Sequence, residues 1–118
     1  MSTPDSLAGL AAHACQPLRG DKHRLPLEQI EAALGVLPGW KLIDDGEVLA
    51  KSFEFNDYYQ TLAFVNALAY VAHAEDHHPD LSVHYNRCIV CFSTHDVGGV
   101  SQNDLICAAK AEQLYGTP

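Results

Sequence analysis

The spacing of apolar positions along the chain predicts three helices. Apolar residues recur every three or four positions over residues 26–37, which places them on one helix face. That first stripe consists of Leu27, Ile30, Leu34 and Leu37. A longer helix is predicted over residues 57–75, capped by Asn56 or Asp57 and bounded by Pro79. Its predicted buried stripe consists of Leu62, Val65, Leu68, Ala69 and Ala72.

The last helix is predicted over residues 102–115, and four other segments are predicted to be strands. Ser101 with Asp104 three residues later resembles a capping box at the start of that helix. The strands are expected at residues 40–43, 48–55, 81–85 and 88–94. Asp44-Asp45-Gly46 joins the first two, because Asp-Gly supplies the positive φ of a tight hairpin. The order α-β-β-α-β-β-α predicts a single α+β domain, with a four-stranded antiparallel sheet and helices packed on one face.

The first part of the chain lacks a clear period. Residues 1–24 have mixed character and contain Pro4, Pro17 and Gly20. We therefore expect a partly ordered N-terminal arm over residues 1–24, within which residues 15–20 could pack on the domain. The domain itself is expected to occupy residues 25–118.

Charge excludes several classes of partner. The chain has 118 residues, with 15 acidic and 7 basic side chains and a formal net charge of −8. This charge repels phosphate backbones and anionic lipids, so we expect no nucleic-acid and no membrane partner. No apolar run approaches the roughly 20 residues of a membrane span. The weakly apolar stretch at residues 7–12 lacks preceding basic residues, so we predict no signal peptide and a cytoplasmic location.

The four cysteines are interpreted as free thiols. They are Cys15, Cys88, Cys91 and Cys107. Cys88 and Cys91 have the spacing of a metal or redox motif, but they lie in a predicted strand, where residues three apart point to opposite faces. The two sulfurs could not share a metal there, and we expect buried, inert cysteines.

Histidines supply the candidate chemistry. Of seven in the chain, five lie between positions 73 and 95: His73, His77, His78, His84 and His95. His77 and His78 follow the predicted long helix, and His95 follows a predicted strand, where polar groups can converge around a pocket. Imidazole has an unperturbed pKa of about 6.5 and can transfer protons near neutrality. Solvated histidines, or a polar cluster at a helix end, remain the simpler alternative, and Asp76 could orient an imidazole.

A metal site is the main competing interpretation of these histidines. His73 and His77 are four residues apart and share a helix face, and His95 or Asp96 could add a third ligand. The helical zinc pattern requires Glu beside the first histidine, however, and Ala74 occupies that position. We therefore predict no metal ligands.

The order and spacing of several motifs resemble one known family. These motifs are His77-His78-Pro79, Tyr85, Ser93-Thr94-His95-Asp96, Gly98-Gly99 and Asp104. Together they resemble the signature of the pterin-4a-carbinolamine dehydratases. The likeness extends over about residues 14–115, including Pro38-Gly39-Trp40, Phe53-Glu54-Phe55 and a lead-in at residues 15–20 like that of bacterial members.

The resemblance implies a hydro-lyase that converts 4a-hydroxytetrahydrobiopterin to quinonoid dihydropterin and water. This reaction recycles the pterin used by aromatic amino acid hydroxylases, which implies a functional link to such an enzyme. Pterin is the substrate, and no metal or organic cofactor is expected. The family also implies a homodimer or homotetramer joined at sheet edges. A non-catalytic pterin-binding or hydroxylase-regulating module, and a small His-ligated metalloprotein, remain alternatives.

The resemblance also implies roles for individual residues. The catalytic residues are His77, His78 and His95; His77 and His95 transfer protons from different sides, and His78 mainly holds the ring. The residues implied to contact the pterin are His77, His78, Pro79, Thr94, His95, Asp96, Val97 and Trp40, although Trp40 is at least as often a core residue. Supporting roles fall to His73, which stands where a glutamate is common, and to Asp76 and Asp104.

Overall fold

The first hairpin of the sheet is set by three consecutive residues with positive φ. In this computed structural model, which describes residues 6–116, strands β1 (Lys41–Ile43) and β2 (Val48–Glu54) flank that turn. The φ angles are 52° at Asp44, 58° at Asp45 and 83° at Gly46. Glycine and, less readily, aspartate tolerate this region. The predicted hairpin is thereby confirmed.

A second hairpin completes the sheet. It consists of β3 (Asp80–Val83) and β4 (Arg87–Phe92), and the strand order is β1-β2-β4-β3 with antiparallel neighbours. β4 ends two residues before the predicted limit, at Phe92. Thr94 then forms an isolated bridge with Gly99 around the short 3-10 helix η2 (His95–Val97). This turn places the Thr94–Val97 segment at the end of a central strand.

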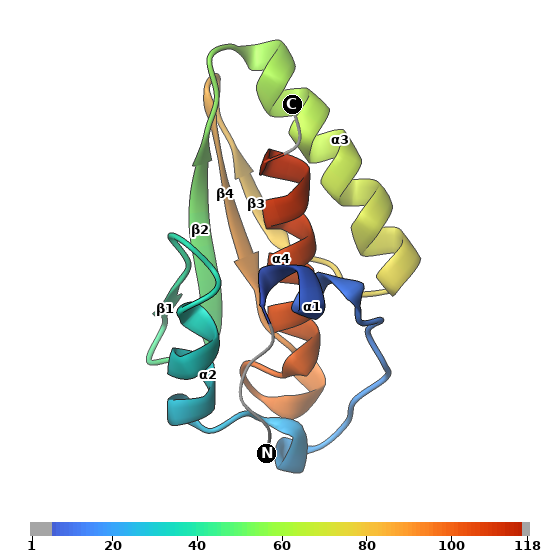
Figure 1. The fold of residues 1–118 in the computed structure, drawn as a ribbon. Helices are drawn as coiled ribbons and strands as arrows, with labels where there is room; N and C mark the ends of the chain where they lie inside the picture. The colour runs from blue at the N-terminus through green and yellow to red at the C-terminus, as the bar shows by residue number, and fades with distance from the viewer. Residues whose placement is uncertain (1–5, 117–118) are drawn as a thin grey trace.

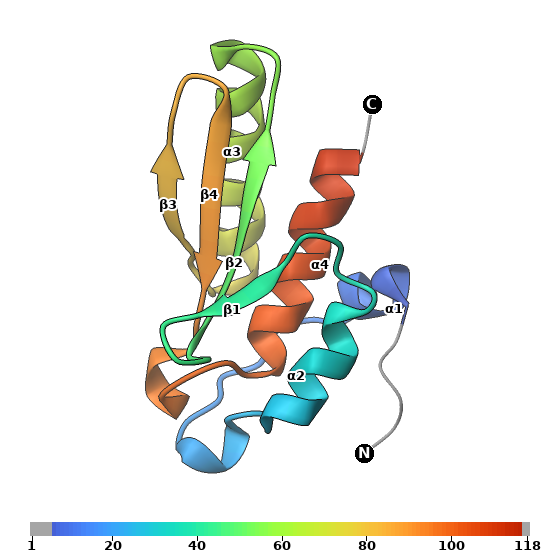
Figure 2. The ribbon, with the colours of Figure 1, turned by 90° about the vertical axis from the view of Figure 1, so that its left-hand side faces the viewer.

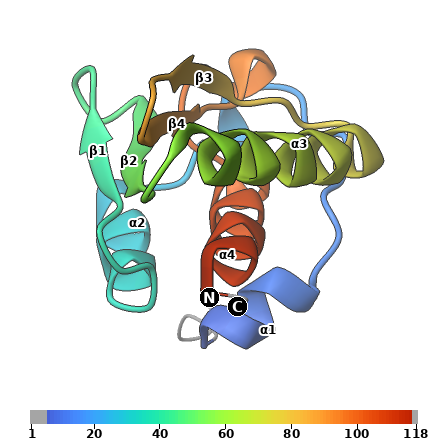
Figure 3. The ribbon, with the colours of Figure 1, turned by 90° about the horizontal axis from the view of Figure 1, so that it is seen from above.

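The helices cover one face of the sheet, which confirms the predicted α+β class (Figures 1 and 3). They include α2 (Leu27–Leu34), α3 (Tyr58–Glu75) and α4 (Gln102–Gly116). Figure 2 shows α3 behind the strands β2, β4 and β3. The first predicted helix ends at Leu34 rather than at residue 37, because the Gly35 N–H bonds the carbonyls of Ala32 and Ala33 and closes the helix. Leu37 is still fully buried.

The buried face of α3 differs from the predicted stripe. Its buried residues are Thr61, Phe64, Leu68 and Ala72, while Leu62 and Val65 are half-buried and Ala69 is exposed. Phe64 sets this orientation, since its ring lies 4.7 Å from that of Phe53 in β2. The Thr61 hydroxyl donates to the carbonyls of Asp57 and Tyr85, each at 3.0 Å. Thr61 lies four residues before Val65, on the same side of the helix, but a pattern that counts only apolar residues omits it.

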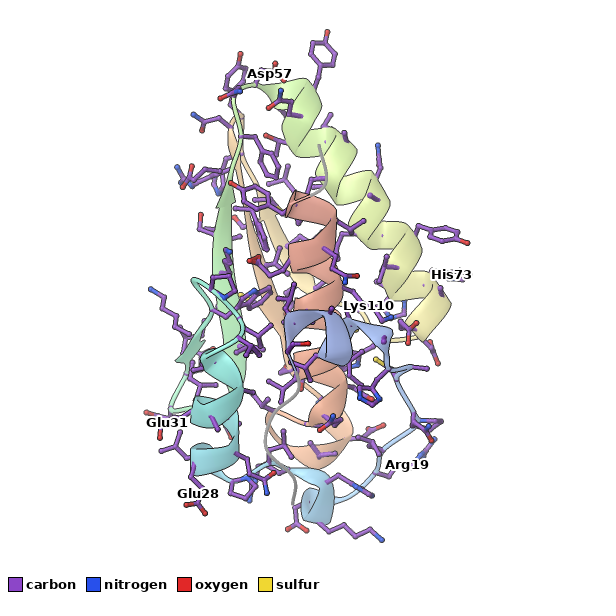
Figure 4. All side chains as sticks on the ribbon, viewed as in Figure 1. Arg19, Glu28, Glu31, Asp57, His73 and Lys110 are labelled. Atoms are coloured by element: carbon purple, nitrogen blue, oxygen red, sulfur yellow. The ribbon has the colours of Figure 1, made fainter. Side chains whose placement is uncertain are left out.

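The segment expected to be a partly ordered arm contains a helix that joins the core. Helix α1 (Leu7–Ala12) packs against α4, and Leu10 and Ala11 are buried. The Lys110 ammonium, on α4, donates to the Ala11 carbonyl at 2.7 Å (Figure 4). From α1 the chain runs past the end of α3 to the short 3-10 helix η1 (Asp21–His23) (Figure 1). Residues 1–5 of the expected arm lie outside the described range.

Candidate active site

A left-handed turn at the end of α3 directs the chain toward α4. Asp76 has φ 52° and ψ 43°, and its N–H bonds the His73 carbonyl at 3.2 Å. The His77 N–H bonds the Ala72 carbonyl at 3.0 Å, which completes a Schellman-type cap. Aspartate is among the few residues besides glycine that adopt this conformation. The cap brings the His77 side chain to the start of α4.

A buried carboxylate, that of Asp104, lies at the start of α4. Asp104 is fully buried, and its Oδ2 accepts the Ser101 N–H at 2.8 Å, while the Ser101 hydroxyl accepts the Asn103 N–H at 3.2 Å. The bond from Asp104 back to the Ser101 N–H is that of the predicted capping box, with aspartate at its third position, while the Ser101 hydroxyl bonds the amide one residue earlier than in the usual box. A carboxylate is also favoured here because the helix dipole is positive at this end.

Asp104 holds His77 with its other oxygen. The distance from His77 Nε2 to Asp104 Oδ1 is 2.6 Å. The Thr94 hydroxyl donates to Asp104 Oδ2 at 2.8 Å and lies 2.6 Å from the Ser101 hydroxyl. An ionised carboxylate only accepts hydrogen bonds, so Nε2 carries the proton and Nδ1 is the nitrogen left to exchange one. The buried Asp104 carboxylate thus accepts three hydrogen bonds, from the His77 ring, the Thr94 hydroxyl and the Ser101 N–H, and these offset the cost of burying its charge.

Packing fixes the plane of the His77 ring. Phe92 stacks on it, with ring centroids 5.8 Å apart and planes 9° apart. The Phe92 ring in turn packs against Trp40, with ring centroids 6.1 Å apart. Trp40 is only 5% exposed and belongs to the core, so the structure places it one ring behind His77 rather than at a cavity wall. Its indole Nε1 is buried without a hydrogen-bond partner among the described residues.

His77 lines a cavity of about 400 Å³. The cavity lies between the end of α3, the start of α4 and the N-terminal segment at residues 15–19. Among its other lining residues are Glu75, Asp76, Thr94, Asp96 and Asn103. Two of the residues predicted to contact substrate, Thr94 and Asp96, therefore meet His77 at one hollow.

His95 lies in a second, smaller hollow of about 230 Å³, which also includes Thr94, Gly98 and Gly99. The sequence interpretation brings His77 and His95 to one cavity, whereas the structure gives them two hollows that share Thr94 as a lining residue. The two histidines are separated by the way the chain turns at η2. Thr94 before this turn and Val97 at its end are buried, while His95 and Asp96 between them are exposed. The Val97 side chain, at 2% exposure, anchors this turn in the core and can offer a ligand only its backbone.

The remaining predicted residues surround the His77 cavity less closely. His78 is exposed, and Pro79 is half-buried just before β3. His73 is exposed on the last turn of α3 and points outward in Figure 4. Asp76 lines the cavity, but its main structural part is the left-handed cap. The carboxylate that orients His77 is thus Asp104, rather than Asp76.

The N-terminal segment forms a cavity wall that periodicity did not identify. The Cys15 N–H donates to Glu75 Oε1 at 2.7 Å, and Gln16 exchanges two hydrogen bonds with the Asn103 side chain, at 3.0 Å and 2.7 Å. The Gly20 N–H donates to the Asp96 carbonyl at 2.9 Å. No regular pattern marks residues 13–20, so only their likeness to a lead-in segment hints at this position. Asn103 has no signal beyond its place in the first turn of α4.

The structure also places the residues that were considered as metal ligands and the cysteines. Over residues 6–116, no group of three metal-ligating side chains comes together, and no helix is long and apolar enough to cross a membrane. Burial alternates along β4, so Cys88 faces the core and Cys91 the opposite side, as predicted. The expectation of buried cysteines holds for Cys88 and Cys107 but is wrong for Cys15 and Cys91, which are half-buried. Burial raises the pKa of the Cys88 thiol, and burial with nearby Asp80 and Asp44 raises that of Cys91.

Most of the chain is similar to known proteins of one family. Residues 23–114 match the profile of a family described as "Pterin 4 alpha carbinolamine dehydratase". A protein of Xylella fastidiosa strain 9a5c, provisionally named pterin-4-alpha-carbinolamine dehydratase, is 53% identical over 94% of this chain and 96% of its own length. A protein of the same provisional name from Stenotrophomonas maltophilia is 55% identical over 92% of this chain and 93% of its own.

Two solved structures are also similar. A "transcriptional coactivator/pterin dehydratase" from Brucella melitensis has a TM-score of 0.76 and 34% identity, covering 79% of this chain and 99% of its own. A "pterin dehydratase-like protein", described as a RuBisCO assembly factor in the alpha-carboxysome, has a TM-score of 0.58 and 25% identity, covering 68% and 93%. The descriptions of these two proteins include roles other than catalysis.

Proposed function

The chain belongs to the pterin-4-alpha-carbinolamine dehydratase family, and we propose that it is a catalytically active 4a-hydroxytetrahydrobiopterin dehydratase. The observation that carries this proposal is the His77–Asp104 pair. One imidazole is held by a buried carboxylate and a stacked ring, and it lines a cavity bounded by the family motifs. Such preorganisation suits a group that must transfer protons.

The reaction needs two proton transfers and consumes none overall. The bond from the pterin C4a carbon to its hydroxyl oxygen breaks, a donated proton turns the leaving hydroxide into water, and a ring nitrogen loses a proton. We propose that His77, through Nδ1, performs one transfer and His95 the other. Positioned acid–base groups contribute about 10²–10⁴-fold in rate. Imidazoles can serve both transfers near neutral pH, so the proposal includes no metal or organic cofactor.

Asp104 supports either direction of transfer at His77. Because Nε2–H is bonded to the carboxylate, the imidazole cannot turn over and present the wrong nitrogen. When Nδ1 accepts a proton, the resulting imidazolium faces a negative charge at 2.6 Å. Asp104 is therefore a positioning residue for the proposed reaction.

The substrate is proposed to span the two hollows around Thr94. His78 would hold the pterin ring, Pro79 would shape the rim, and the backbone of the η2 turn would bind the amide edge of the pterin. The exposed position of His95 leaves it free to rotate toward a ligand that bridges both hollows.

Assembly is proposed to involve the edge of the sheet. β3 is an edge strand, and Val83 at its end and Tyr85 just after it are exposed, so a second copy could pair there to give a homodimer or homotetramer. The functional link to an aromatic amino acid hydroxylase and the cytoplasmic location stay predictions.

The direct test is stopped-flow decay of 4a-hydroxytetrahydropterin with and without the purified chain. An active dehydratase speeds the decay in proportion to protein concentration. The similar carboxysome factor favours one alternative, a non-catalytic module of the same fold. Under that alternative the spontaneous decay rate is unchanged, whether or not dihydrobiopterin binds. Elemental analysis of untagged protein tests the metalloprotein alternative in parallel.

A further inference from the structure

Two free cysteines from distant parts of the chain meet beside the His77 cavity. Cys15, in the N-terminal segment, and Cys107, on α4, have their Sγ atoms 3.5 Å apart although 92 positions separate them in sequence. A disulfide requires a separation of about 2.05 Å. A shift of about 1.5 Å in the N-terminal segment would therefore bring the sulfurs to bonding distance.

The two thiols differ in access. Cys15 is half-buried and lines the cavity that contains His77, so a small solute in that cavity can reach its sulfur. Cys107 is 1% exposed. Its hydrogen bond with Cys15, its burial and the nearby Asp104 and Glu75 carboxylates all raise the pKa of the Cys107 thiol. Cys15 is consequently the sulfur that an oxidant meets first, with Cys107 held behind it as a protonated partner.

Local hydrogen bonds keep the pair aligned. The Cys15 thiol donates to the Asn103 carbonyl at 3.7 Å, and the Cys15 N–H donates to Glu75 at 2.7 Å. Gln16 is bonded in both directions to the Asn103 side chain. Because Asn103 lies one helical turn before Cys107, these contacts fix the segment over the same part of α4.

We propose that Cys15 and Cys107 are a peroxide-sensitive thiol pair that forms a reversible disulfide and ties the N-terminal segment to α4. The Cys15 thiol loses its proton and its sulfur attacks one peroxide oxygen. The O–O bond breaks, and the hydroxide released takes up that proton, which gives a Cys15 sulfenic acid and a water. The Cys107 sulfur then displaces the hydroxyl, and its proton leaves with that hydroxyl as a second water. In sum, two thiols and one hydrogen peroxide give one disulfide and two waters, and a dithiol reductant reverses the change.

The disulfide would close one wall of the cavity covalently. Residues 15–19 line the cavity, and in the reduced protein they are held only by hydrogen bonds and packing. The link also closes a long loop, which restricts the unfolded chain and stabilises the folded one. This inference is independent of whether the chain is a dehydratase.

The experiment treats the full-length reduced protein with hydrogen peroxide, alkylates the remaining thiols under denaturing conditions, and maps peptides without reduction. We expect a peptide containing Cys15 linked to one containing Cys107, within a single chain, and its disappearance with dithiothreitol. Cys88 and Cys91 should remain alkylated, because they face opposite sides of β4. Linkage through Cys88 or Cys91, linkage between chains, or no linked peptide would each overturn the proposal.

Matched variants separate the two sulfurs. In Cys107→Ala, the Cys15 sulfenic acid has no partner and should be captured by dimedone. In Cys15→Ser, which changes one atom at a half-buried position, no link should form. Peroxide should raise the Tm of the wild type and leave that of Cys15→Ser unchanged. An equal Tm shift in both proteins would contradict the proposal even if Cys107→Ala folded poorly.

Discussion

The two histidines on either side of Thr94 are held very differently. His77 is clamped, with a carboxylate at 2.6 Å on one nitrogen, a phenyl ring stacked on its face and a side chain only 10% exposed. His95 begins a three-residue 3-10 turn and is exposed. The chain therefore has one imidazole already held in place, and a second whose position depends on the turn that carries it.

The interactions that stabilise the two sides of Thr94 also differ. The His77 side depends on a buried network in which Asp104, Thr94 and Ser101 satisfy one another. Such a network is costly to break, because each lost partner leaves a buried polar group unpaired. The His95 side depends on the burial of Val97 and on the Thr94–Gly99 bridge. Substitutions should thus be severe on one side and mild on the other.

Asp104→Ala should have the largest effect. It leaves His77, Thr94 and the Ser101 N–H without their shared acceptor. Because each buried donor left unpaired costs about 1–3 kcal/mol, we expect a loss of about 3–5 kcal/mol in the free energy of unfolding. Urea titration followed by circular dichroism measures it. Asp104→Asn is the matched control, because it keeps the volume and one acceptor oxygen and should lose less. Equal stability of Asp104→Ala and wild type would refute the network.

Thr94→Val should have the second-largest effect on the free energy of unfolding. Valine keeps the shape of threonine but removes the hydroxyl that donates to Asp104 Oδ2, so we expect a loss of about 1–3 kcal/mol. Thr94→Ser keeps the hydroxyl and should recover part of that loss. The same urea titrations give both values. A valine variant more stable than the serine variant would mean that the methyl group, not the hydroxyl, matters here.

Asp76→Gly tests the turn that delivers His77. Glycine adopts the left-handed conformation without the penalty of about 1–2 kcal/mol that a Cβ carries, so the Tm should rise modestly. Asp76→Ala keeps the penalty and should lower it. If the glycine variant melts below the alanine variant, the aspartate side chain rather than the backbone angle determines the cap.

His95→Ala should change stability least, by no more than about 0.5 kcal/mol, because the side chain is exposed. Val97→Ala in the same turn is the matched contrast, since it removes a buried side chain worth about 1.5–3 kcal/mol. Thermal melts of both variants make the comparison. A His95→Ala variant as unstable as Val97→Ala would show that His95 is also clamped.

The sequence predicted most of this architecture where local signals were strong. The Asp44-Asp45-Gly46 turn, a helix cap at Asn56 or Asp57 and the Ser101–Asp104 capping box all act within a few residues. All are found, and the helix cap is Asp57. The prediction of the buried face of α3 was wrong because Thr61 is buried through hydrogen bonds, which a pattern of apolar residues does not include.

The site was only partly predictable. Asp104 was placed among the supporting residues by resemblance, but its contact with His77 joins positions 27 apart and depends on the left-handed Asp76. Separate hollows for His77 and His95 follow from the burial of Val97, which no spacing reveals. Packing of residues 15–20 on the domain was an expectation, but their place at the cavity wall was not predicted, because its hydrogen bonds come from irregular backbone.

The central claim is that imidazoles from both hollows exchange protons with one pterin. Stopped-flow decay of 4a-hydroxytetrahydropterin, measured at saturating pterin for His77→Ala, His95→Ala and the double variant, tests it most directly. We predict that each single variant folds and turns over more slowly, by up to about 10²–10⁴-fold, and that the double variant approaches the spontaneous rate. Wild-type turnover in both folded single variants would contradict it.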